Sequence, residues 1–484
     1  MGDAAAEQFS FSDWILVDPS NAMAAADDDD AASPAGCGDE NARSVLLDVK
    51  AYSGASKNAS TARSKTSSGH TIEVTFCTVP PPALSHISVH CPGLQLPPDD
   101  LSLSPCAVAV AAAADLVVLR VPVNTLGKDY FQYNDYFVYR AHRQDPKLDL
   151  LPNPWPYCFG DQEIAILSRG AVTADGDDNQ YVVAALKIIP SFTLHLYRSK
   201  PCGETGSWTV QPVSVETPLR DSVCPIPDTA KRHFYHATSN VITLGGANGT
   251  VGWVDLWRGI LLCDVLEERP KLRDVPLPLP AKGNWEGSSM TASALSGTSP
   301  SASTRSASMV KNTVSSPEPA TYLEWVRRKD CLPPPTRSVV PGWWKAMPIP
   351  VTSWEDWHTE CTAESHEFDV GDGDPRNCEL LQELMSSSGG DCDEEEAKEA
   401  ALSPSPAYGL PRLEHRRRCC INQHKRLNKT DVVYLSCKAA SRGLMGLVAA
   451  VDVRKKELRV AKLDIERNTC FMRTYIATEI SKYL

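Results

Sequence analysis

The sequence predicts a mostly-β, propeller-like fold of antiparallel meanders, interrupted by disordered acidic and Ser-rich loops. Apolar runs of about four to eight residues recur between Pro, Gly and Asp residues, as is typical of strands. Long stretches with the periodicity of helices are scarce. Closely spaced runs separated by turn residues favour pairing between neighbours in sequence. We therefore expect successive meanders that leave few free sheet edges.

The candidate strands of the first half share a β-branched or aromatic apolar core. They are residues 13–17, 71–77, 116–121, 136–140, 163–167, 181–188, 193–197 and 208–213. Between residues 163 and 213, turn residues at 174–177 follow the first strand, and Pro190 and Ser191 join the next two strands. A strand that contains Trp208 comes last. That order fits one meandering sheet.

The clearest hairpin lies in NVITLGGANGTVGWVDLWRGILLCDVL, which begins at Asn240. Asn248 and Gly249 are suited to supply the positive φ values of a tight turn. A second turn at 256–259 then joins strands 252–256 and 259–266. A three-stranded meander results.

Strand alternation places the side chains of this meander on two faces. Trp253 and Asp255 share one face, and Val254 and Leu256 share the other. Asp255 and Arg258 flank Trp257 across the turn. We expect these two charged residues to form a local ion pair that fixes the hairpin, contributing about 0–1 kcal/mol as a surface pair.

The C-terminal part repeats the strand pattern. Residues 431–437, 446–453 and 458–464 are candidate strands, and the charged tip 454–456 turns the chain between the last two. The tryptophans of the second half, with Trp253 and Trp257, are expected to fill the space between sheets, since Trp buries a large area. Those further along the chain are Trp343, Trp344, Trp354 and Trp357.

Three segments lack the large apolar residues that would offset ordering entropy. They are residues 27–30 within an Ala-rich stretch, the Ser/Thr-rich span 287–308, and the acidic tract 386–406. We interpret them as linkers or loops.

Composition limits the function classes. The 60 acidic and 48 basic residues give a net charge of −12, which makes nucleic acid an unlikely partner. The longest weakly polar stretch, 107–119, is interrupted by Asp115 and too short for a bilayer, so no membrane role is expected. The N-terminus has neither a secretory nor a transit pattern, which predicts a cytoplasmic or nuclear protein that is not secreted. The 16 cysteines are then expected to be reduced, mostly as small buried hydrophobes.

Several motifs resemble a plant family, abundant in grasses, called domain of unknown function 1618. The central ones are WVDLWRGILLCDVL from Trp253 and LRDVPLPLP from Leu272. DVVYLSCKA from Asp431, GLVAAVDVRKKEL from Gly446 and the ending ISKYL are similar to the family's C-terminal pattern. FSDWILVD and PPALSHISVHCPG near the start are also similar. One departure is the span 287–308, where such proteins usually continue with another strand pair.

The resemblance implies no catalytic residues, because the family has no assigned activity. Its structural signature here is Trp253, Asp255, Trp257, Arg258 and Gly259. The strand order also looks like the propeller-type domains that follow F-box motifs, an analogy at the level of fold alone. The organisation we predict is a disordered N-terminus at 1–8, an N-terminal β-meander region at 9–285, a family signature region at 251–370, an acidic disordered loop at 386–406, and a C-terminal β-meander at 425–484 that closes the same fold.

The best metal candidates are His415, Cys419, Cys420 and His424, because thiolate and imidazole suit zinc. They are weak candidates: adjacent cysteines rarely reach one tetrahedral ion together, and no second C-x-x-C accompanies them. The basic residues around them fit a charged loop better than a nuclear-import or phosphate-binding patch. We therefore predict no metal and no cofactor.

Catalytic motifs are also lacking in the sequence. Gly246, Gly249 and Gly252 form a loose glycine pattern, but it leads into a strand, whereas a dinucleotide fingerprint opens a helix. There is no G-x-S-x-G elbow, H-E-x-x-H helix or Walker loop. A triad assembled from distant strands would leave no such signal.

The leading hypothesis is a non-enzymatic protein–protein interaction module with an unknown protein partner. One alternative is an adaptor in ubiquitin ligation, against which stands the missing F-box segment at the N-terminus. Another is an enzyme with a sequence-scattered site, which predicts a deep pocket with convergent ionisable side chains.

Overall fold

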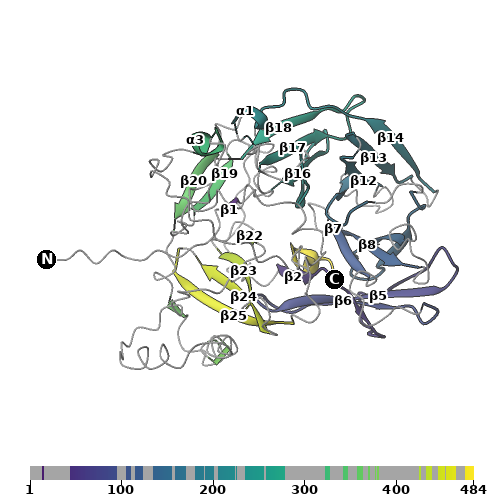
Figure 1. Ribbon diagram of the computed structural model, residues 1–484. Coiled ribbons are helices and arrows are strands. Elements are labelled where there is room, and N and C mark those ends of the chain that lie inside the picture. Colours follow the sequence, from purple (N-terminus) through teal and green to yellow (C-terminus); the bar gives the residue numbers. More distant parts are fainter. Residues whose placement is uncertain are drawn as a thin grey trace, which may run out of the picture.

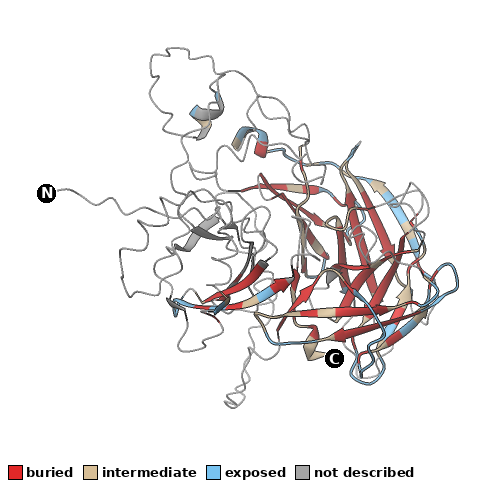
Figure 2. Ribbon diagram, turned by 60° about the horizontal axis from the view of Figure 1, so that its bottom comes forward, coloured by how far each residue is buried: buried red, intermediate tan, exposed pale blue. Residues whose placement is uncertain are grey.

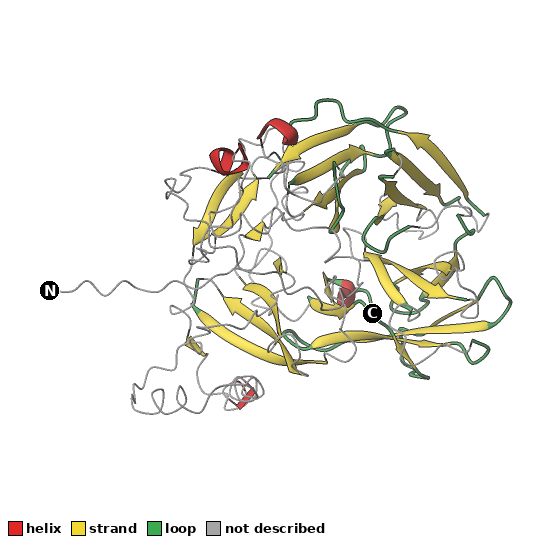
Figure 3. Cartoon of the chain, in the orientation of Figure 1, coloured by secondary structure: helices red, strands yellow, loops and turns green. Residues whose placement is uncertain are grey.

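The computed structural model of the chain consists mostly of strands (Figure 1, Figure 3). The structure describes residues 14–15, 44–94, 105–110, 115–123, 134–154, 159–169, 180–189, 191–200, 205–223, 225, 235–255, 258–277, 322–327, 342–346, 357–362, 369–370, 377, 379–380, 424–426, 432–438, 445–452, 454–464 and 475–484. These residues form six sheets, and the prediction of a mostly-β fold is confirmed.

The first two sheets come from the N-terminal part of the chain, with one strand from its end. The first sheet has the order β26-β2-β6-β5-β4, with β3 beside β6. Its strands are β2 (Val45–Asp48), β3 (Tyr52–Ser53), β4 (Ala62–Lys65), β5 (Thr71–Cys77), β6 (Leu84–His90) and β26 (Tyr475–Thr478). The second sheet comprises β7 (Cys106–Val110), β8 (Leu116–Pro122), β9 (Asn134–Arg140) and β10 (Lys147–Leu150).

The third and fourth sheets are four-stranded antiparallel meanders in chain order. The third sheet comprises β11 (Ile164–Arg169), β12 (Gln180–Lys187), β13 (Thr193–Arg198) and β14 (Ser207–Pro212). The fourth comprises β15 (Asn240–Gly245), β16 (Thr250–Asp255), β17 (Gly259–Asp264) and β18 (Leu272–Pro276). Helix α1 (Arg220–Val223) lies on the connection between them.

The fifth and sixth sheets contain the later strands. The fifth has β1 (Trp14–Ile15) parallel to β19 (Gly342–Ala346), which pairs with β20 (Trp357–Thr362). The sixth comprises β21 (Asp369–Val370), β22 (His424–Arg426), β23 (Val432–Lys438), β24 (Met445–Asp452) and β25 (Glu457–Asp464). Two short helices are α3 (Tyr322–Arg327) and η10 (Ile480–Lys482). Of the helices in the described part of the chain, none has the length and hydropathy of a membrane span.

Neighbouring sheets share hydrophobic cores, in the order in which they follow one another around the ring of Figure 1. One core contains Val117 from β8 and Ile72 from β5, and so joins the first two sheets. Further cores join the second sheet to the third, the third to the fourth, and the sixth to the first. This arrangement is propeller-like, as the sequence predicts.

Burial of both faces explains why the strands read as continuous apolar runs. In β12, Val183 faces the core shared with the second sheet, and Val182 faces the core shared with the fourth. A strand packed on two sides needs apolar residues at every position. Figure 2 shows the resulting buried strands, with exposed residues gathered on outer strands and loops.

The first sheet unites strands from the two ends of the described chain. β26 pairs antiparallel to β2, with Val45 opposite Thr478. β2 in turn runs parallel to β6, an exception to the expected antiparallel pairing. The pair β21–β25 and the pair β1–β19 are also parallel.

The hairpin before Trp253 differs in detail from the prediction. Its positive φ values belong to Gly245 at 73°, Gly246 at 76° and Gly249 at 62°, with no such value at Asn248. Three glycines therefore carry the turn that was expected to rest on Asn248 and Gly249. The glycine pattern enters strand β16, which supports its interpretation as hairpin geometry. The segments predicted as loops, 27–30, 287–308 and 386–406, and the N-terminus 1–8 lie outside the described residues.

Candidate functional site

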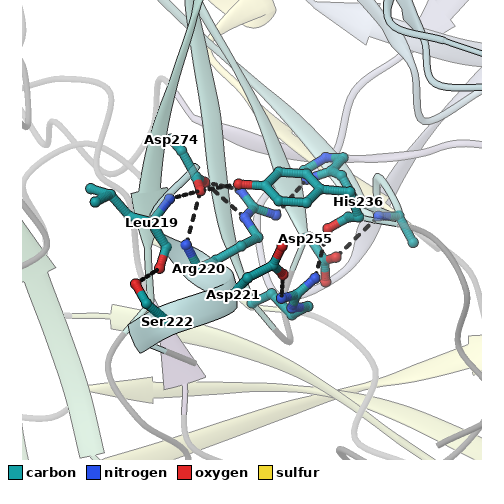
Figure 4. Close-up of polar contacts among 10 residues, drawn as sticks. Leu219, Arg220, Asp221, Ser222, His236, Asp255 and Asp274 are labelled. Carbon is teal, nitrogen blue, oxygen red and sulfur yellow. Dashed lines mark hydrogen bonds and ion pairs between the residues drawn. The ribbon is translucent and has the colours of Figure 1, made fainter. Parts of the chain in front are cut away.

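A buried polar cluster lies where α1 meets the fourth sheet (Figure 4). Its centre is the pair Arg220 and Asp274, whose side chains are both completely buried. Arg220 Nε donates to Asp274 Oδ1 at 2.7 Å, and Arg220 Nη2 lies 2.5 Å from the same oxygen. A buried pair of this kind is stable only when hydrogen bonds satisfy its remaining polar atoms.

The second carboxylate oxygen of Asp274 receives three donors. The backbone N–H groups of Leu219 and Arg220 donate to Oδ2 at 3.0 and 3.1 Å, and the hydroxyl of Tyr235 donates to the same atom. The first turn of a helix leaves its N–H groups without intrahelical acceptors, so Asp274 caps α1 from a distant strand. Burial opposes ionisation, yet the hydrogen bonds and charge of Arg220 hold the pKa of Asp274 below its usual value.

Tyr235 lies between two guanidinium groups. The Cζ atoms of Arg220 and Arg258 are 5.0 and 5.6 Å from the centre of its ring, within the range of cation–π attraction. Burial raises the pKa of the Tyr235 hydroxyl, and its hydrogen bond to ionised Asp274 raises it further. Tyr235 is therefore a neutral donor in this cluster.

His236 completes the inner part of the cluster. Its Nδ1 lies 2.9 Å from Arg220 Nη1. A guanidinium has only donors, so Nδ1 accepts this hydrogen bond and the imidazole carries its hydrogen on Nε2. His236 itself is almost completely buried.

The family signature residues lie on the outer side of the same cluster. Arg258 Nη2 donates to Asp221 Oδ1 at 2.6 Å, and its Nη1 donates to the backbone oxygen of Tyr235 at 3.0 Å. Asp255 Oδ2 accepts the N–H of Ala237 at 3.0 Å. The expected ion pair was between Asp255 and Arg258. These bonds instead connect Asp255 to the segment 235–237, and Arg258 to both that segment and α1. Asp255 and Arg258 are both buried, so the expectation that they form a surface ion pair is wrong.

Gly259 is required by close packing. A Cβ atom there would lie 2.6 Å from the backbone oxygen of Val275 and 3.1 Å from Arg220 Nη2. Both distances are too short for an ordinary contact. Only glycine allows β17 and Arg220 to approach this closely.

Trp253 joins the third and fourth sheets. Its side chain is completely buried in their shared core, and its indole N–H donates to the backbone oxygen of Glu163 at 2.8 Å. The indole N–H of Trp208, on β14, donates to the backbone oxygen of Pro152 at 2.8 Å. Of the tryptophans predicted to fill the space between sheets, Trp253 does so. Trp257 and Trp354 lie outside the described residues, and the structure does not describe the side chains of Trp343, Trp344 and Trp357.

A second polar cluster links the second and third sheets. Arg120 donates from Nε to Asp161 Oδ1 at 2.7 Å and from Nη2 to Oδ2 at 3.1 Å. The thiol of Cys106 donates to the same carboxylate at 3.4 Å. Burial raises the pKa of Cys106 to about 12, so this thiol stays protonated. Cys263 is likewise buried and free.

The metal candidates are not brought together by any described contact. His424 begins β22, and His415, Cys419 and Cys420 lie outside the described residues. Among the residues that the structure does describe, no group of three or more His, Cys, Asp or Glu side chains is placed to hold a metal ion.

Comparison with known proteins identifies the region that contains the signature. The family model described as protein of unknown function (DUF1618) matches residues 253–434. Residues 253–434, called the DUF1618 region below, are similar to this family. The predicted resemblance is thereby confirmed. Searches of curated proteins and of solved structures each found no match.

The DUF1618 region supplies one half of the buried cluster. Asp255, Arg258 and Asp274 belong to it, whereas Arg220, Tyr235 and His236 precede it. Arg220, Tyr235 and His236 were not predicted from the sequence as site residues. Asp274 lay inside the quoted LRDVPLPLP motif, where the neighbouring Arg273 is also charged, so charge alone did not distinguish it. The cluster therefore ties the DUF1618 region to the segment before it.

Proposed function

We propose that this protein is a non-enzymatic protein–protein interaction module that works in the cytoplasm or nucleus. The supporting observation is the use of the ionisable side chains in the described sheets. Arg220, Asp274 and Arg258 bond to backbone groups and to one another across neighbouring segments, and Arg120 and Asp161 do the same. These groups stabilise the scaffold, and their hydrogen-bonding capacity serves the fold.

The architecture supports the same proposal. Consecutive sheets bury both faces against each other, so loops and outer strand edges form the accessible surface. Scaffolds of this kind present binding residues on loops held by a rigid core. The negative net charge of −12 favours protein surfaces over nucleic acid as partners.

The proposal is tested by crosslinking and affinity purification from the native tissue, followed by reconstitution with each recovered protein. We expect one recovered protein to form a stoichiometric complex with the purified chain in sedimentation velocity. The doubly substituted control Lys271→Ala with Glu216→Ala removes an exposed ion pair and should bind equally well. Failure of every recovered protein to bind the purified chain would contradict the proposal, as would steady turnover of a small molecule by the chain alone.

A further inference from the structure

The outer edges of the first four sheets are protected to different degrees. An exposed edge strand offers unpaired backbone groups, and natural proteins cover such edges or place charges on them. β4 has the sequence ARSK and β10 has KLDL, so both carry charged residues. β14 has the sequence SWTVQP, which contains no charge.

The edge of β18 is covered by the chain itself. Val215 forms a parallel bridge with Leu272. The N–H of Glu216 donates to the oxygen of Leu272 at 3.0 Å, and the N–H of Leu272 donates to the oxygen of Ser214 at 3.0 Å. α1 then continues this cover through its bonds to Asp274. The fourth sheet thus has a protected edge.

β14 has no fully buried residue. All six of its residues are exposed or only partly buried, and Val210 is 42% exposed. In Figure 1, β14 lies on the outside of the ring, beyond β13. Of the four outer strands β4, β10, β14 and β18, β14 alone combines exposure with an uncharged sequence.

The register of β14 identifies which backbone groups point outward. The N–H of Val213, directly after β14, donates to the backbone oxygen of Phe192, directly before β13, at 3.0 Å. These two residues are therefore a hydrogen-bonded pair. Antiparallel pairs alternate between bonded and non-bonded positions. Thr209, opposite Leu196, is therefore a bonded position, whereas Trp208 and Val210 direct their N–H and C=O groups away from β13. Pro212 adds a carbonyl and no donor.

A positive charge lies over this edge. Arg198 on β13 extends across β14, and its Nη1 donates to the hydroxyl of Thr209 at 3.2 Å. That hydroxyl is neutral and does not compensate the charge. An added strand would lie about 4.8 Å beyond β14, within reach of a long side chain such as arginine. A carboxylate opposite Thr209 would complement Arg198.

We propose that β14 is the docking edge for an extended segment of a partner protein, which adds as a further strand and places acidic side chains toward Arg198. This mode of recognition uses main-chain hydrogen bonds for affinity and alternate side chains for specificity. The inference rests on the proposed interaction function and names its site. The outward groups of Trp208 and Val210 supply the hydrogen bonds, and Val210 contacts the apolar face of the partner segment.

A second copy of this chain fits the edge less well. Two β14 strands related by a two-fold axis would pair Trp208 with Val210 of the other copy, and Thr209 with its own equivalent. Both Arg198 guanidiniums would then lie beside that one pair of threonines, and like charges placed together are unfavourable. A partner that supplies carboxylates avoids this repulsion.

The test uses two synthetic peptides of about eight residues, one alternating valine with glutamate and the other alternating valine with lysine. Binding to the full chain is measured by fluorescence anisotropy, and amide exchange of residues 205–213 is followed by mass spectrometry. We expect the glutamate peptide to bind at least about tenfold more tightly than the lysine peptide, and to protect the amides of Trp208 and Val210.

Two proline variants distinguish the loss of a hydrogen-bond donor on the β14 edge from a general effect of proline on the fold. Val210→Pro removes an outward donor that β13 does not use, and should weaken binding at least about tenfold. Lys65→Pro is the matched control on the charged edge strand β4. The N–H of Thr66 donates to the backbone oxygen of His70, so the N–H of the preceding residue, Lys65, points away from β5. This control variant should leave binding unchanged. Arg198→Gln should abolish the preference for glutamate over lysine. Circular dichroism verifies that each variant is folded.

Specific results would overturn the inference. Equal binding of the glutamate peptide to the Val210→Pro variant would do so, as would no binding to the wild-type chain. A protein partner that binds the Val210→Pro variant as well as wild type would leave the interaction function standing and remove β14 as its site. A wild-type dimer that the same variant dissociates in sedimentation velocity would assign the edge to a second copy.

Discussion

The indole N–H of Trp253 donates to the backbone oxygen of Glu163, although Trp253 belongs to the fourth sheet and Glu163 precedes the first strand of the third. This bond fixes how far the two sheets can separate. It also explains why tryptophan, with an apolar body and one donor, occupies a position between sheets.

Replacing this tryptophan should loosen the interface between the sheets. Trp253→Phe removes the donor, leaves a buried carbonyl unsatisfied and creates a small cavity, and should lower the free energy of unfolding by about 2–4 kcal/mol. Urea denaturation measures the change. Trp208→Phe removes a similar bond at a partly exposed site and should cost less. An unchanged free energy of unfolding in Trp253→Phe would show that the interface does not depend on this side chain.

The Arg220–Asp274 pair should show strong coupling. Arg220→Met alone leaves a buried carboxylate without its cation and should cost about 3–5 kcal/mol, as should Asp274→Asn. The double variant should be more stable than the sum of the two losses predicts. Exposed Lys271 and Glu216 form the matched pair, for which the same cycle should give less than about 1 kcal/mol. Additive losses at Arg220 and Asp274 would contradict direct coupling.

Gly259 should tolerate no side chain. Gly259→Ala forces a Cβ against the oxygen of Val275 and against Arg220, and should destabilise the protein by about 1–3 kcal/mol in thermal unfolding. Gly54→Ala is the control, since its new Cβ would have its nearest neighbour at 3.9 Å. If both variants unfold at the same temperature, the close packing around Gly259 is not a constraint on stability.

His195 should make stability depend on pH. Burial, together with a smaller effect of the charge of Lys187, lowers its pKa from 6.5 to about 4. In the unfolded chain the imidazole takes up a proton below its ordinary pKa, whereas in the fold it does so only near pH 4. Its contribution is therefore complete above about pH 6.5 and is lost as the pH falls toward 4, at about 1.4 kcal/mol per pH unit.

Urea unfolding at a series of pH values measures this dependence. His195→Gln should flatten the profile between pH 6.5 and 4, relative to wild type. His142→Gln, which changes an exposed histidine, should retain the wild-type slope. An unchanged slope in the His195 variant would assign the pH dependence to other groups.

The cysteines should differ in reactivity. Burial raises the pKa of Cys106 and Cys263 to about 12, whereas Cys77 is partly exposed. The thiolate is the reactive form, so iodoacetamide at about pH 8 should label Cys77 before Cys106 and Cys263 in the folded chain. Peptide mass spectrometry reads the labelled sites. Denaturation in urea should make the three thiols equally reactive, and labelling of Cys106 in the native chain would place it in an open environment.

Strands could be predicted from the sequence where both faces are buried. Residues 71–77 coincide with β5, and 181–188 with β12 to within one residue at each end, because buried apolar residues dominate both strands. β4, with the sequence ARSK, was missed, since an edge strand contacts a neighbour on one side and tolerates charge. Local pattern alone did not identify that strand.

The buried cluster was predicted only in part. The signature contained Asp255, Arg258 and Gly259, but the nearest partners of Arg258 were unknown because Asp221 lies on a separate segment. Long-range pairing depends on how sheets pack, and the local sequence around Arg220 does not encode which strand its guanidinium will meet. Periodicity reports local structure, whereas this cluster joins α1 to a strand of the fourth sheet that lies far along the chain.

The pairing of β26 with β2 has a consequence for synthesis of the chain. Most sheets described here form between consecutive strands, so they can assemble while the ribosome is still adding residues. By contrast, β2 can pair with β26 only after residues 475–478 have been synthesised, because Val45 lies opposite Thr478. Until the final strand emerges, the nascent first sheet has an unfilled place beside Leu46 and Leu47, and a frameshift or early stop before Tyr475 would leave that apolar strand open to aggregation.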